Sequence, residues 1–243
     1  MSGHSKWANI KRKKGANDAI RGKITTKIGR EITVAVRMGG SDPIGNMRLK
    51  LALTKAKANN IPKDNIQRAI QKGLGSADGA NFEELIYEGY GPAGSAVMLD
   101  IMTDNRNRTA ADIRHLFSKH GGNLGETGCV GWMFQKKAVF IIERENYDDE
   151  ENLMMMVLDA GADDFKAEDD VFEITADPQD FDAIAKVLEE NNIETAEAEI
   201  TMVPDNTVTL AGKDAEKMMI LIEALEEHDD VQNVYANYEI EEA

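Results

Sequence analysis

Two segments of this sequence concentrate side chains that can bind an anion. The first is an N-terminal arm, residues 1–16, which is rich in Lys and Arg and has little that is apolar except Trp7 and Ile10. The second is the loop 103–109, Thr-Asp-Asn-Arg-Asn-Arg-Thr, which leads into a predicted helix. Clustered Lys and Arg attract phosphates through charge neutralisation and counterion release, and helix N-termini also favour anions. Both segments therefore indicate a phosphate or carboxylate ligand.

The candidate nucleic-acid-binding residues come from these two segments and from the helix that follows the arm. They are His4, Lys6, Trp7, Lys11, Arg12, Lys13, Lys14, Arg21, Lys23, Lys27, Arg30, Arg106 and Arg108. Trp7 could stack on an unpaired base, or it could be partly buried and anchor the arm. Arg106 could bind a ligand, or it could pair with Asp100 or Asp104. The sequence leaves both alternatives open.

Motifs for other chemistry are weaker. Residues 89–94, Gly-Tyr-Gly-Pro-Ala-Gly, match the glycine spacing of a dinucleotide site, but that fingerprint requires a helix immediately afterwards. An apolar, β-branched run follows instead, so we expect a hairpin turn. Asp112 and His115 share one helix face, yet a metal site needs several converging ligands. We therefore expect no metal, no cofactor, no small-molecule substrate and no enzymatic activity.

The charge of the chain is unevenly distributed. The 243 residues carry a net charge of −16, but residues 1–80 hold 17 Lys and Arg against 5 Asp and Glu, whereas residues 81–243 hold 11 against 39. Such asymmetry indicates a polyanion-binding part joined to an acidic remainder. No apolar run approaches the roughly 20 residues of a membrane span, and no secretory signal is visible, so we expect a cytoplasmic protein.

The first 80 residues predict a basic helical domain. Apolar residues recur every four positions from Ile20 to Val36, which indicates one helix that begins at Asn17 or Asp18 and ends at Gly39-Gly40. Two shorter helices are expected over about 46–58 and 63–72. A glycine-rich linker follows.

The acidic remainder predicts two α/β domains, which makes the fold class α+β. Residues 81–135 together with 205–243 should form one domain, with a hairpin over 85–90 and 96–102. Further expected elements of this domain are a helix whose capping box is Thr109 and Asp112, a short strand over 131–134, a strand over 207–210, a helix, and a last strand over 234–240.

Residues 136–204 should form the second α/β domain, inserted in the first. The expected order is a strand over 138–142, a helix over 148–159 capped by Asp148, a hairpin over 165–168 and 171–175, a helix opened by Asp177-Pro178, and a strand over 196–202. The order β-α-β-β-α-β is that of a ferredoxin-like, split βαβ domain. Met154, Met155 and Met156 are expected to fill its core.

Several segments also resemble a known family. GHSKWANIKRKKGANDAIRGK, GGSDPIGNMRL, IPKDNIQRAIQKG, IYEGYGP, TDNRNRT and GGNLG, spread over residues 3–125, are similar to the YebC/PmpR family of bacterial proteins. Its eukaryotic relatives include the mitochondrial translational activator of cytochrome c oxidase subunit I. The departures are small: Ile20 stands where a Lys is usual, and Ala93 replaces a Gly. The resemblance implies three domains, a cytoplasmic location and no enzymatic activity.

The family resemblance implies two related functions. Members are described as DNA-binding transcriptional regulators, and others act on the ribosome as translation factors. We expect a DNA-binding transcriptional regulatory protein, with a ribosome-associated translation factor that contacts ribosomal RNA as the alternative, and an adaptor that works through the acidic half as a third. The expected partner is DNA, or ribosomal RNA and the ribosome if the protein is a translation factor. We expect no membrane partner. Because Ile66 and Ile70 should face inward, no helix-turn-helix recognition helix is visible.

Overall fold

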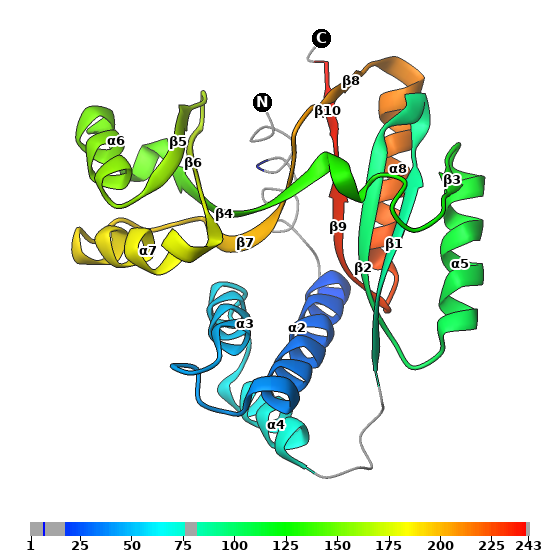
Figure 1. The fold of residues 1–243 in the computed structure, drawn as a ribbon, viewed down its shortest axis with the longest axis horizontal. Helices are drawn as coiled ribbons and strands as arrows, with labels where there is room; N and C mark the ends of the chain where they lie inside the picture. The colour runs from blue at the N-terminus through cyan, green and yellow to red at the C-terminus, as the bar shows by residue number, and fades with distance from the viewer. Residues whose placement is uncertain (1–6, 8–17, 76–81, 242–243) are drawn as a thin grey trace. The chain divides into compact units, whose positions relative to one another are not determined.

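The computed structural model describes residue 7 and residues 18–75 and 82–241. The chain forms two compact units. The smaller comprises Met1–Arg12 and Met133–Thr207, and the larger comprises Lys13–Trp132 and Val208–Ala243. A helical region comes first and two regions that contain sheets follow, so the α+β class is confirmed (Figure 1). None of the described helices is long and apolar enough to cross a membrane.

The helical region of the larger unit contains α2 (Asp18–Gly39), α3 (Met47–Ala58) and α4 (Lys63–Leu74), close to the predicted bounds. The four-residue apolar stripe of α2 is confirmed where the side chains are described, because Ile28, Ile32 and Val36 are buried in one cluster with residues of α3 and α4. A β-carbon at Gly73 of α4 would lie 2.7 Å from the Thr33 carbonyl, so this position allows α4 to approach α2 closely.

Asn46 connects the end of α2 to the start of α3. Its buried side chain accepts the N–H of Leu49 at 3.1 Å and so caps α3. The same side chain donates to the carbonyls of Ala35 and Gly40, both at 2.8 Å. One amide therefore satisfies backbone groups of two helices at once.

The sheet of the larger unit has the order β3-β1-β2-β9 and is antiparallel throughout. Its strands are β1 (Glu83–Tyr90), β2 (Ala96–Thr103), β3 (Asn123–Leu124) and β9 (Val231–Ala236), and the helices α5 (Arg106–Lys119) and α8 (Gly212–Glu227) pack against it. Leu99, Phe117 and Leu221 lie in the shared core. Strands β1 and β2 flank residues 91–95, so the predicted hairpin turn is confirmed.

Three local predictions for this unit are wrong. The helix α5 begins at Arg106, and its cap is Asn105, whose side chain accepts the N–H of Arg108, so Thr109 and Asp112 form no capping box. Residues Gly131–Met133 form a short 3₁₀ helix instead of a strand. The predicted last strand is two strands in different sheets, β9 and β10 (Tyr238–Ile240), and β10 pairs in parallel with β8 (Val208–Leu210). Asn237 separates them, and its side chain accepts the N–H of Ala96.

The smaller unit contains the predicted ferredoxin-like arrangement. Its elements are β4 (Phe134–Glu143), α6 (Glu150–Asp159), β5 (Ala162–Ala167), β6 (Val171–Ala176), α7 (Phe181–Glu190) and β7 (Glu197–Pro204). The antiparallel sheet has the order β5-β6-β4-β7, which confirms the split βαβ topology. Phe140 of β4 stacks on Phe181 of α7, with their ring centroids 4.9 Å apart, and so joins the sheet to a helix.

Two expectations for α6 are wrong. The helix begins at Glu150 and is capped by Asp149, whose side chain accepts the N–H of Asn152, so Asp148 is not the cap. Leu153 and Val157 are the buried residues of α6, whereas Met154 and Met155 are exposed. Successive helical residues point about 100° apart, so three adjacent methionines cannot all face one core.

We predict that Asn46→Ala lowers the free energy of unfolding by about 1–3 kcal/mol, because it removes a cap and leaves buried backbone groups unpaired. Urea unfolding of the full chain measures the loss. Asn59→Ala is the matched control, since Asn59 is exposed and its side chain donates to the carbonyl of Lys55. Equal losses for the two variants would contradict the role of Asn46.

Candidate nucleic-acid interface

The structure describes seven of the thirteen candidate residues, namely Trp7, Arg21, Lys23, Lys27, Arg30, Arg106 and Arg108. The other six, His4, Lys6, Lys11, Arg12, Lys13 and Lys14, lie outside the described residues. The described candidates do not form one surface. Lys23 and Lys27 donate to carbonyls at the end of α8, and Arg30 and Arg108 contact Asp230 in the connection from α8 to β9. Trp7 lies in the smaller unit.

Three cations of α2 contact the C-terminal end of α8. Lys27 Nζ donates to the carbonyl of Glu226, and Lys23 Nζ donates to that of Glu227 at 3.0 Å. Arg30 Nη1 donates to the carbonyl of Asp229 at 2.8 Å. The last carbonyls of a helix lack intrahelical partners and carry the negative end of its dipole, so cations are favoured there. These interactions attach α2 to the α/β part of the larger unit.

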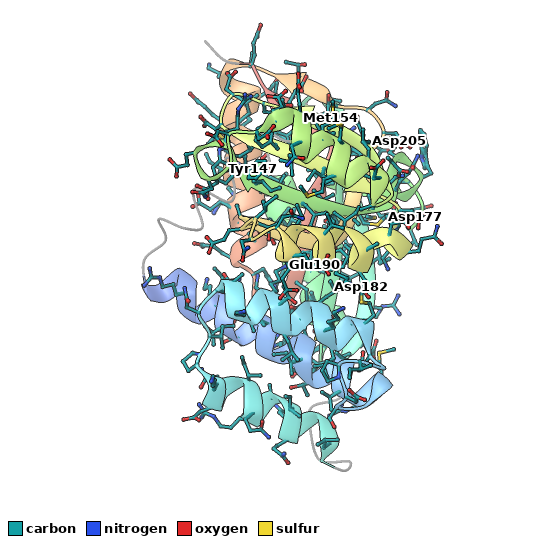
Figure 2. The ribbon with its side chains drawn as sticks, turned by 90° about the vertical axis from the view of Figure 1, so that its left-hand side faces the viewer. Tyr147, Met154, Asp177, Asp182, Glu190 and Asp205 are labelled. Carbon is teal, nitrogen blue, oxygen red and sulfur yellow. The ribbon has the colours of Figure 1, made fainter. Side chains whose placement is uncertain are left out.

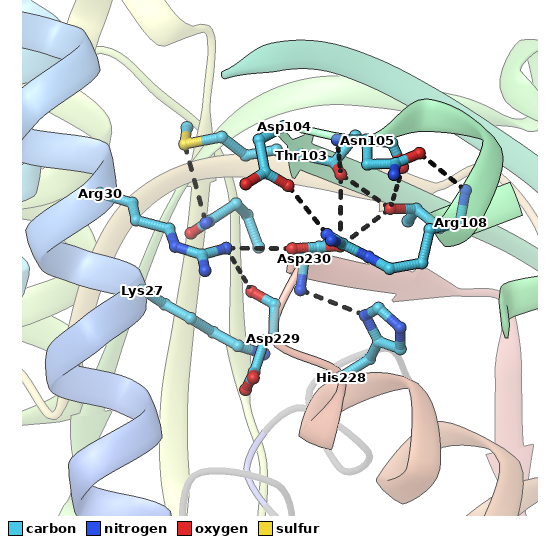
Figure 3. A network of polar contacts seen from close by, with 12 residues as sticks. Lys27, Arg30, Thr103, Asp104, Asn105, Arg108, His228, Asp229 and Asp230 are labelled. Atoms are coloured by element: carbon cyan, nitrogen blue, oxygen red, sulfur yellow. Dashed lines mark hydrogen bonds and ion pairs between the residues drawn. The ribbon is translucent and has the colours of Figure 1, made fainter. Parts of the chain in front are cut away.

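Asp230 joins Arg30 of α2 to Arg108 of α5 (Figure 3). The residue is only 4% exposed, and its carboxylate lies 3.3 Å from Arg30 Nη1 and 2.9 Å from Arg108 Nη2. The hydroxyls of Thr109 and Thr103 lie 2.8 and 3.3 Å from the same carboxylate. Burial raises the pKa of Asp230, but the bonds from Arg108, Thr109 and Arg30 together outweigh it and hold that pKa below its ordinary value.

The loop 103–109 is therefore arranged around a carboxylate of the same chain. Arg108 also pairs with Asp104 at 2.9 Å, and these two acids reduce what its charge can offer a ligand. Arg106 is exposed instead, and the hydroxyl of Tyr87 donates to its carbonyl. Among the described residues, neither Asp100 nor Asp104 pairs with Arg106. Asp100 accepts hydrogen bonds from Asn233 and Tyr235, and Asp104 pairs with Arg108.

Trp7 is an anchor in this structure. Its side chain is 7% exposed and packs in a cluster with Val139, Ile141 and Val171. The indole Nε1 donates to Asp170 at 3.4 Å. A ring in this position is not available to stack on a base, so the structure favours the second of the two alternatives for Trp7.

Sequence analysis missed the cations of α3. This helix contains Arg48, Lys50, Lys55 and Lys57 and no acidic residue, which is the signal that could have identified it. Arg48 is bound to Glu31 and Glu84. Lys50 and Lys57 are exposed, and because they are seven residues apart, about two helical turns, they lie on the same side of α3.

Two other features that resemble binding sites are structural. The buried carboxylate of Glu88 accepts hydrogen bonds from the N–H groups of Gly128, Val130 and Gly131, so these amides already bind an anion of the chain.

Burial and the charge of Glu88 raise the pKa of the Cys129 thiol, which lowers the fraction of reactive thiolate at neutral pH. Within the described residues, no group of three or more His, Cys, Asp or Glu is placed to hold a metal ion.

Comparisons with known proteins match the whole architecture. Residues 5–76 match the family model described as the TACO1/YebC protein N-terminal domain, and residues 82–238 match the one described as the TACO1/YebC second and third domain. A "probable transcriptional regulatory protein" of Pelotomaculum thermopropionicum is 60% identical over 100% of both chains. One of Desulforamulus reducens is 58% identical over 99% of this chain and 100% of its own. The crystal structure of the conserved hypothetical protein Aq1575 from Aquifex aeolicus is similar with a TM-score of 0.83 and 44% identity, over 93% of each chain.

We predict that Asp230→Asn destabilises the chain by about 1–3 kcal/mol at neutral pH, because the charged partner of two arginines is lost. The folded pKa of Asp230 is below the unfolded value of about 3.9, so its stabilisation is present above that pH and is lost as the pH falls through the folded pKa. The difference between the variant and the unchanged chain should therefore shrink as the pH falls below about 4, in urea unfolding measured over a pH series.

Asp229→Asn is the control for Asp230→Asn. Asp229 is exposed, and Arg30 contacts its carbonyl, which the substitution keeps. We expect its free energy of unfolding to change by less than about 0.5 kcal/mol. A pH-independent loss for Asp230→Asn would show that the charge of Asp230 is not what stabilises this network.

Proposed function

Because this chain belongs to the TACO1/YebC family, we propose that it is a nucleic-acid-binding regulator of gene expression, acting as a DNA-binding transcriptional regulatory protein. The names of its relatives support regulation of transcription. The observation that carries the binding function is the charge of the helical region: residues 18–75 contain 12 Lys and Arg against 4 Asp and Glu. A surface of this sign neutralises phosphates and releases their counterions.

We assign the primary phosphate contacts to the exposed cations of α3 and to the basic arm. Lys50 and Lys57 lie on one side of a helix without acidic residues, so a nucleic-acid strand along that side meets no repulsion from α3 itself. Arg37 at the end of α2 and Lys63 and Lys72 of α4 are also exposed and add to the positive field of this region.

The cations held at the α8–β9 connection have a different role in this proposal. Lys23, Lys27 and Arg30 already donate to carbonyl or carboxylate oxygens, and a phosphate would have to displace those acceptors. They hold the helical region against the α/β part of the same unit. The exposed cations outside this network then meet the nucleic acid.

The helical region favours contact with the phosphate backbone over reading of base sequence. Ile66 and Ile70 of α4 pack against the helical core, which leaves this helix few side chains that could enter a major groove. Phosphate contacts position a protein on nucleic acid but carry no sequence information directly. The same observation favours a second candidate function, a ribosome-associated translation factor that contacts ribosomal RNA. In both cases the proposal is a cytoplasmic protein without catalytic activity.

Crosslinking in cells, followed by sequencing of the recovered nucleic acid, tests the choice between the two targets. We expect enriched promoter DNA for the transcriptional regulator. Recovery of mainly ribosomal RNA would overturn the DNA assignment in favour of the translation factor. Recovery of neither, above a control that lacks crosslinking, would contradict nucleic-acid binding altogether.

Salt dependence tests the assigned surface. Each phosphate contact contributes about 0.9 to the log–log slope of affinity against salt on duplex DNA and about 0.7 on single strands. Lys50→Ala with Lys57→Ala should therefore lower the slope by about 1–2 and weaken binding to all sequences equally. Lys186→Ala with Lys213→Ala removes two exposed lysines from the acidic part of the chain and should leave the slope unchanged. Equal slopes for both double variants would place the phosphate contacts elsewhere.

A further inference from the structure

Helices α6 and α7 lie side by side on the same face of the ferredoxin-like sheet (Figure 1, Figure 2). Each helix buries one side, which contains Leu153 in α6 and Phe181 in α7. A helix at the surface of a domain ordinarily carries charged and polar residues on the opposite, outer side. Helix α7 follows this rule. Its exposed residues are Asp182, Ala183, Lys186, Glu189 and Glu190.

The outer side of α6 carries large apolar side chains instead. Met154, Met155 and Leu158 are 37%, 59% and 44% exposed. Residues three and four apart are neighbours on a helix surface, so Leu158 adjoins both methionines. We call these three residues the α6 patch. A helix with apolar residues on both sides is typical of a helix that is covered on both sides, so the α6 patch indicates a site for a partner.

Acidic residues lie beside the α6 patch. Glu151 precedes Met155 by four residues and Asp159 follows it by four, so both adjoin Met155 on the exposed side of the helix. Helix α6 contains no Lys or Arg. The one basic residue of α7 is Lys186, which lies 3.7 Å from Glu190. The outer side of α6 is therefore both apolar and negative.

The whole smaller unit has a charge of the same sign. Residues 133–207 contain 22 Asp and Glu against 5 Lys and Arg. Arg144, which lies shortly before α6, is paired with Glu150 at 3.0 Å. A field of this sign repels phosphates and anionic lipids and attracts a cationic partner. The charge thus favours a basic protein over a nucleic acid or an anionic membrane.

The residue types of the α6 patch favour an amphipathic helix as the partner. Methionine is unbranched and polarizable, so it adapts its shape to the side chains that pack on it. An amphipathic helix that lays its apolar side on an apolar surface is a recurrent mode of recognition between proteins. Basic residues next to the apolar side of such a helix can pair with Glu151 and Asp159.

We propose that the α6 patch is a docking site for a basic amphipathic helix of a partner protein. The apolar side of that helix packs on Met154, Met155 and Leu158, and its Lys and Arg residues meet Glu151 and Asp159. The site belongs to a different unit from α3, to which the phosphate contacts are assigned. A protein partner and a nucleic acid then use separate surfaces of the chain.

The probe for this site is a labelled peptide of Leu and Lys, about five helical turns long, with Leu on one side of the helix. Fluorescence anisotropy measures its affinity for the full chain. Met155→Gln with Leu158→Gln should weaken binding about ten-fold, because a few central apolar contacts carry most of the binding energy of such an interface. Gln is a good helix former, so α6 should persist, and circular dichroism verifies it.

Met219→Gln with Ile220→Gln is the matched control. These residues of α8 are 52% and 50% exposed, so the variant removes a similar apolar surface from the larger unit. We expect an unchanged affinity for the Leu and Lys peptide. A loss equal to that of the α6 variant would show that the α6 patch is not the docking site.

Two further peptides separate the apolar contact from the attraction of charge. A peptide with Ser in place of every Leu should bind about ten-fold more weakly, and a peptide of Leu and Glu should not bind, because the acidic unit repels it. Added salt should weaken binding of the Leu and Lys peptide. If the Ser and Lys peptide binds as tightly as the Leu and Lys peptide, the proposal is wrong.

Methyl NMR of the methionines locates the contact. The signals of Met154 and Met155, assigned by single substitutions, should shift when the Leu and Lys peptide binds, and the signal of Met219 should not. Two results would assign the α6 patch to another occupant and overturn the proposal. One is self-association of the chain in sedimentation velocity that Met155→Gln with Leu158→Gln abolishes. The other is binding to phosphatidylglycerol vesicles that the same variant abolishes.

Discussion

A buried carboxylate must be paired, and Asp230 shows how this constraint organises the larger unit. Its carboxylate lies in the connection from α8 to β9 and meets Arg30 of α2 and Arg108 of α5. Leaving such a charge unpaired would be costly, so the two arginines and two threonine hydroxyls fix three elements around one group. The carbonyls at the end of α8 extend the same contact to Lys23 and Lys27.

Carboxylates of the chain occupy several places that an external anion could otherwise take. Asp230 lies where the basic loop 103–109 could receive a phosphate, and Glu88 fills a group of three backbone amides. In the smaller unit, Asp170 binds the indole of Trp7. The uneven charge of the sequence is thus partly compensated within the fold.

This compensation reduces the positive charge that the helical region exposes. Lys50 and Lys57 are exposed, and they belong to a helix that lacks acidic residues. The arm is the other concentration of positive charge in the sequence, and it contains Trp7, which is buried against strands of the ferredoxin-like sheet.

The sequence by itself determined the elements whose signals are local. The four-residue stripe of α2, the turn between β1 and β2 and the order of the ferredoxin-like elements all follow from periodicity and turn residues within short windows. The predictions from sequence are wrong where the local structure depends on a residue that is distant in the sequence. Thr109 resembles a helix cap, but its hydroxyl binds Asp230, 121 residues away, while Asn105 caps the helix one turn earlier.

Only the tertiary structure decided which cations of the helical region have acceptors from distant segments of the chain. Lys23 and Lys27 resemble the other lysines of the helical region in sequence, yet their acceptors are carbonyls at the end of α8, about 200 residues further along the chain. The burial of Trp7 likewise depends on Val139, Ile141 and Val171. Periodicity and capping report interactions within a few residues, whereas pairing of charges and burial of a side chain depend on segments that only folding brings together.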